Sequence, residues 1–124
     1  MSDELTRHIV DDLVGCALSL SAFNITLDLN TKLSLLQKLN KEYGSLFKKL
    51  ESGRISVAGL DAAVPIAKEK LASEIERRSD FNFDAEESDK LAKASPSRVN
   101  QIVSYLKEKK AAQVNVSIVF REQE

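Results

Sequence analysis

A long apolar repeat between residues 29 and 50 constrains this sequence more than any other feature. Its members follow one another in alternating steps of four and three residues: Leu29, Leu33, Leu36, Asn40, Tyr43, Phe47 and Leu50. This heptad spacing predicts a helix. Asn40 is its one polar member, and a lone asparagine at such a position in a coiled coil fixes register and oligomer state. The sequence therefore predicts an oligomer seam whose central positions are Leu33, Leu36, Asn40, Tyr43 and Phe47.

The same helix supports a second interpretation. Leu35, Leu39 and Leu46 widen the apolar arc beyond the two-position stripe of a coiled coil, to a width typical of a helix in a globular bundle. The seam would then pack inside the chain. Both interpretations follow from the spacing, and each predicts a helix over 29–50.

Helical patterns also occupy the preceding and following segments. Apolar residues at helical spacing predict a first helix over about 3–21, whose second half is expected to be buried nearly all round. A later helix is expected to begin at Asp61 or Ser56. Pro65 is expected to be tolerable only if it lies in the first turn of that helix. This later helix carries a thin apolar stripe and a charged exterior, so it should cover the core from outside.

The last helical region is predicted to consist of two helices. Asp84, followed three residues later by Glu87, is a capping-box pattern and predicts a short helix over 85–94. Ser95 and Pro96 then supply a cap and a first-position proline, so they predict the start of another helix.

An alternating pattern near the C-terminus predicts a β-strand over 114–120. A lone strand needs a partner. Residues 23–29 alternate in the same way and would pair with it, although a loop in which Asp28 caps the next helix fits them equally. Otherwise the partner is the same strand in a neighbouring subunit. The apolar positions that would form the pairing edge are Val114, Val116, Ile118 and Phe120.

These patterns together predict an α+β fold that is predominantly helical. It would contain four to five helices and a minimal β-element, made by 114–120 with or without 23–29, in a single domain of residues 1–124.

The composition indicates the expected surroundings of the protein. With 43% hydrophobic and 30% charged residues the chain is typical of globular proteins. No apolar run reaches the roughly 18–20 residues of a membrane span, and the acidic N-terminal residues argue against a secretory signal. A single cysteine fits a reducing compartment. We therefore expect a cytoplasmic protein that does not enter membranes.

The residues needed for common catalytic and metal sites are too few or too far apart. The one histidine, His8, and the one cysteine, Cys16, are separated by about 12 Å of helix, so they do not form a nucleophile pair. They also cannot make a Cys/His zinc site. Four dispersed glycines supply no phosphate loop. No enzyme activity, metal, cofactor or small-molecule substrate is therefore expected.

A helix-turn-helix interpretation of residues 88–110 offers a second function. The predicted turn at Ser95-Pro96 separates two helices, and the segment carries six basic residues against Asp89 and Glu108. Donors near the start of the second helix could reach base edges. The overall net charge of −1 argues against bulk electrostatic capture of nucleic acid. The candidate DNA contacts are Ser97, Arg98, Asn100 and Gln101.

The seam over 29–50 together with the β-pattern over 113–120 is similar in organisation to phage small terminase subunits. Those proteins join DNA-binding and oligomerising helices to a C-terminal β-segment that assembles between subunits. The resemblance implies a ring-forming packaging component, but their DNA-binding signature is not recognisable in residues 1–28. The function expected first is a non-enzymatic interaction protein of phage or bacterial type, such as an adaptor, an inhibitor or immunity protein, or an assembly factor. It would bind a protein partner or its own copies, with DNA association as the alternative.

Overall fold

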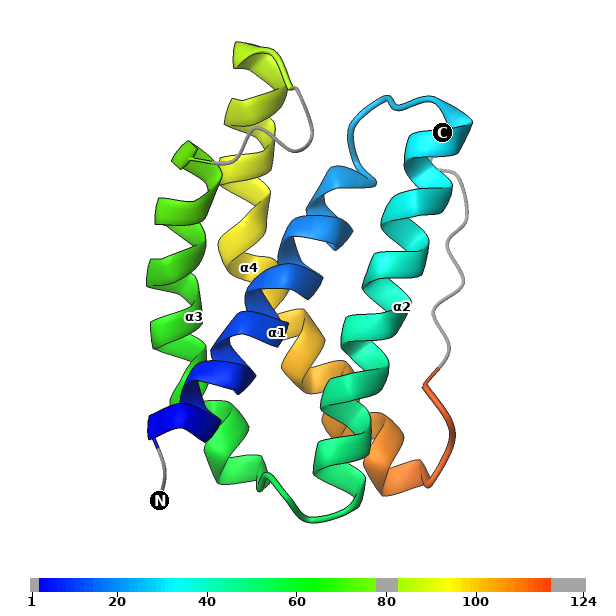
Figure 1. The fold of residues 1–124 in the computed structure, drawn as a ribbon, viewed down its shortest axis with the longest axis vertical. Helices are drawn as coiled ribbons and strands as arrows, with labels where there is room; N and C mark the ends of the chain where they lie inside the picture. The colour runs from blue at the N-terminus through cyan, green and yellow to red at the C-terminus, as the bar shows by residue number, and fades with distance from the viewer. Residues whose placement is uncertain (1–2, 78–82, 117–124) are drawn as a thin grey trace.

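Four helices run alternately up and down in the computed structural model of the chain, which describes residues 3–77 and 83–116 (Figure 1). They are α1 (Asp3–Ala22), α2 (Leu29–Glu51), α3 (Val57–Arg77) and α4 (Ala85–Ala112). α1 packs against all three other helices, and α3 packs against α4. α2 and α4 run in the same direction and touch only sparsely. None of the helices in the described ranges is long and apolar enough to cross a membrane.

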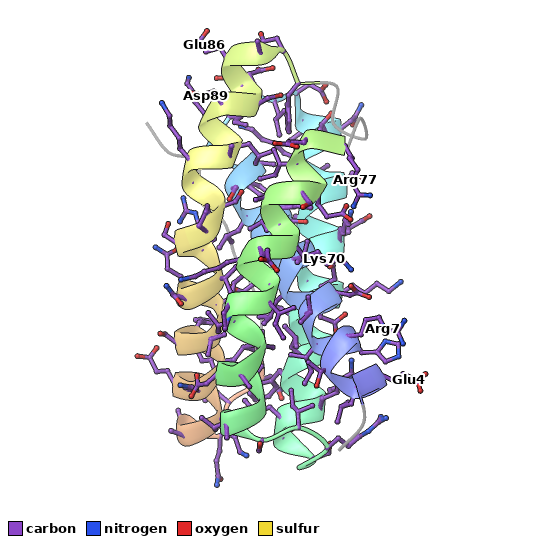
Figure 2. All side chains as sticks on the ribbon, turned by 90° about the vertical axis from the view of Figure 1, so that its left-hand side faces the viewer. Glu4, Arg7, Lys70, Arg77, Glu86 and Asp89 are labelled. Atoms are coloured by element: carbon purple, nitrogen blue, oxygen red, sulfur yellow. The ribbon has the colours of Figure 1, made fainter. Side chains whose placement is uncertain are left out.

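The second half of α1 is buried on every side because three helices surround it. Leu13, Cys16, Ala17 and Leu18 are completely inaccessible to solvent, which confirms the prediction that this half is buried nearly all round. Charged side chains lie on the outer surfaces of the bundle, where Figure 2 shows examples such as Arg7, Arg77 and Glu86 pointing outward.

Residues 23–28 form a turn followed by a loop, so the strand alternative for 23–29 is wrong and the alternative of a loop in which Asp28 caps the next helix is confirmed. The amides of Phe23 and Ile25 donate to carbonyls three residues back, so the chain leaves α1 through a tightening turn. Asp28 then caps α2, because its carboxylate accepts the Thr31 amide at 2.8 Å. Leu29 is the first residue of α2. The alternation arose because Ile25 and Leu27 pack against the core beneath a loop.

The predicted β-element is also not present in the described residues. Val114 and Val116 are not in a strand, and the Val114 amide donates to the Lys109 carbonyl at the end of α4. Gln113 adopts the left-handed conformation that ends a helix (φ 55°). Ile118 and Phe120 lie outside the described residues. The fold is thus a four-helix bundle in the part of the chain that the structure describes, and the α+β prediction is wrong.

α4 is a single helix, so the predicted break at Ser95-Pro96 is wrong. The capping box of Asp84 and Glu87 is confirmed, but the helix it opens continues through Pro96 to Ala112. Pro96 lies on the exposed side, where the carbonyl that its missing amide would have paired with can face water. On the inner side, an unbroken row of buried residues crosses the proline: Leu91, Ser95, Val99, Ile102, Val103 and Leu106.

Pro65 in α3, like Pro96 in α4, lies on the exposed side of a continuous helix. The helix begins at Val57, so the proline lies more than two turns inside it and not in the first turn. Pro65 is exposed, while Leu60, Ala63, Ala67 and Leu71 are buried on the opposite side. In both helices the burial of a continuous apolar face outweighs the local cost of a proline on the solvent side.

Candidate functional site

The α2 seam divides into an exposed half and a buried half. Leu29 and Leu33 are 69% and 48% exposed, and Asn40 is exposed. Tyr43 and Phe47 are only 3% and 4% exposed and belong to the core. The exposed side continues along one line of the helix, which we call the α2 stripe: Leu29, Leu33, Leu36, Asn40 and Gly44.

The buried half of the seam lies where the C-terminal halves of α2 and α4 meet. There the rings of Tyr43 and Tyr105 pack edge to face, with centroids 5.5 Å apart. At the last residue of the seam, the Lys110 ammonium donates to the Leu50 carbonyl at 3.1 Å. Nearer the N-terminus of α2, Leu35 and Leu39 face the core instead. That orientation turns Leu29 and Leu33 outward.

Gly44 is a part of the stripe that the sequence patterns did not single out. A Cβ built on it would meet no described atom within 4 Å, so nothing in the described ranges requires a glycine there. A glycine inside a helix costs about 1 kcal/mol relative to alanine. The sequence did contain a clue to Gly44, because a glycine within a helical pattern destabilises the helix and usually has a packing or functional reason.

Basic residues outnumber acidic ones along this part of α2, although Lys38 lines a cavity on the side of the helix away from the stripe. Between Leu29 and Gly44 the sequence carries Lys32, Lys38 and Lys41 against one acid, Glu42. The Glu42 carboxylate does not face the stripe, because it packs against the backbone of α1 at Gly15.

An open cavity of about 330 Å³ lies on the other side of α2, between it, α1 and α3. Lys70 forms an ion pair with Asp11 at its edge. Both acidic and basic side chains line the cavity, so its lining is not of one charge sign. Its lining residues are Asp11, Val14, Gly15, Lys38, Glu42, Lys70 and Glu74.

The contact between Gly15 and Glu42 gives a test of how α1 and α2 meet. A Cβ at Gly15 would overlap the Glu42 carboxylate. We expect Gly15→Ala to change the free energy of unfolding by less than about 1 kcal/mol, because the Glu42 carboxylate must move aside and the cost of that movement offsets the gain in helix propensity. In the Glu42→Ala background the same change should instead stabilise by up to about 1 kcal/mol. Urea denaturation of the four proteins measures this cycle, and an equal effect in both backgrounds would contradict the contact.

His8 and Cys16 do not form a reactive pair. His8 is on the surface, where its Nε2 lies 3.9 Å from Glu4 Oε2. Cys16 is fully buried, and its burial, together with the nearby Glu42 and Asp12 charges, raises the pKa of its thiol well above the usual value. A thiol in such surroundings stays protonated and is a poor nucleophile. In the described ranges, no group of three or more His, Cys, Asp or Glu side chains could hold a metal ion.

The four candidate DNA contacts lie within one continuous helix and not at the start of a recognition helix. The Ser97 hydroxyl donates to the Ala94 carbonyl at 3.0 Å, and Arg98 donates to the Gln101 side chain at 2.9 Å. Asn100 is exposed. Since the two-helix unit is not present, DNA contact stays a prediction from the side chains alone.

The predicted strand-pairing edge is also divided. Val114 is exposed, and Val116 is half-buried against the core. The resemblance to small terminase subunits depended in part on a β-segment over 113–120. Val114 and Val116 are not in a strand, so this part of the resemblance is not supported at those residues.

Comparison with protein-family models, with curated proteins and with solved structures found no match for this chain. The candidate function therefore rests on the geometry of the chain itself, and above all on the α2 stripe.

Proposed function

We propose that this protein acts by binding another macromolecule through the α2 stripe, as an adaptor, inhibitor or assembly factor would, and not by catalysis. The observation that carries the proposal is the exposure of two leucines, Leu29 and Leu33, one turn apart on the same helix. Half-buried Leu36 continues the apolar surface toward Asn40. Single exposed leucines are common, but adjacent ones on a rigid helix are typical of a contact surface.

The energy available at this surface is appreciable. Complete burial of a leucine side chain stabilises by about 1.5–3 kcal/mol relative to exposure. Burial of the remaining exposed area of Leu29 and Leu33 would therefore contribute a few kcal/mol before the cost of association is subtracted. Such a surface suits a reversible interaction.

Self-association, as predicted from the heptad spacing, is one form of this function. A complete seam would need Tyr43 and Phe47 in the interface, but both side chains are buried within the chain. Only the exposed half of the seam remains for a second copy.

The proposal is tested by placing a charge on the stripe. Leu33→Asp should abolish partner binding with little change in stability, because Leu33 is 48% exposed. Ile66→Asp on α3 is the matched control, since Ile66 is 47% exposed and lies on a different helix. Light scattering at two concentrations and quantitative affinity capture compare the three proteins.

We expect any concentration-dependent association, and the set of captured proteins, to be kept by Ile66→Asp and lost by Leu33→Asp. If Leu33→Asp is monomeric to the same degree as the unaltered protein and captures the same set, the stripe is not the binding surface.

A further inference from the structure

We draw no further inference here: the strongest candidate, the α2 stripe on the outer side of the bundle, is the surface already described, and nothing in the described residues shows what covers it.

Discussion

Replacing Phe47 with alanine is expected to lower the free energy of unfolding by about 3–5 kcal/mol, whereas Leu33→Ala should lower it by less than about 1 kcal/mol. Both residues belong to the same heptad pattern, so the sequence spacing alone predicts similar effects. The structure predicts a large difference, because Phe47 is 4% exposed and part of the core while Leu33 is 48% exposed. The first change leaves a cavity in the core, and the second removes area that water already reaches.

The measurement is urea denaturation followed by helical circular dichroism, at several protein concentrations. A monomeric transition with these two effects would place the buried half of the seam inside the chain. Equal effects, or a midpoint that rises with protein concentration for both variants, would instead support a seam that is buried between chains.

Replacing Pro96 with alanine is expected to raise the free energy of unfolding by about 1–3 kcal/mol. In the middle of a helix a proline removes one hydrogen bond and crowds the preceding turn, at a cost of about 3 kcal/mol, and loss of its rigidity in the unfolded chain returns part of this. α4 continues unbroken on both sides of Pro96, so alanine should be the better residue. Had a helix begun at this proline, the same replacement would be neutral or destabilising.

Pro65→Ala is the companion variant, since Pro65 lies on the exposed side inside α3 and should respond in the same direction. The shift of the urea midpoint at constant slope measures both changes. A stability loss in Pro96→Ala together with a gain in Pro65→Ala would show that α4 is broken at the proline in solution.

The helices themselves could be predicted well from the sequence. The expected range of 29–50 corresponds to Leu29–Glu51, and the expected range of 3–21 corresponds to Asp3–Ala22. The caps at Asp28 and Asp84 were also evident, since a side chain that accepts an amide three residues on is a local interaction. Periodicity and capping depend on neighbours within a few residues, so one sequence contains them.

The division of the seam could not be predicted in the same way. Tyr43 is buried because Tyr105, 62 residues later, packs on it, and Leu33 is exposed because α4 meets α2 elsewhere. The predictions of a helix break at Pro96 and of a strand over 23–29 were wrong for a related reason. Each local signal was outweighed by an apolar face or a core contact formed with distant residues, such as the packing of Ile25 against the core.

The central position of α1 has a consequence for how the chain acquires its structure during synthesis. α1 is translated before the other three helices, but its buried surface is fully covered only when α2, α3 and α4 have all been made. At about 5–20 residues per second, the ninety residues from Ala22 to Ala112 take about 5–18 s to add. Throughout that interval Leu13 and Leu18 face water or a chaperone. α4, which is made after the other three helices of the bundle, therefore completes the environment of α1.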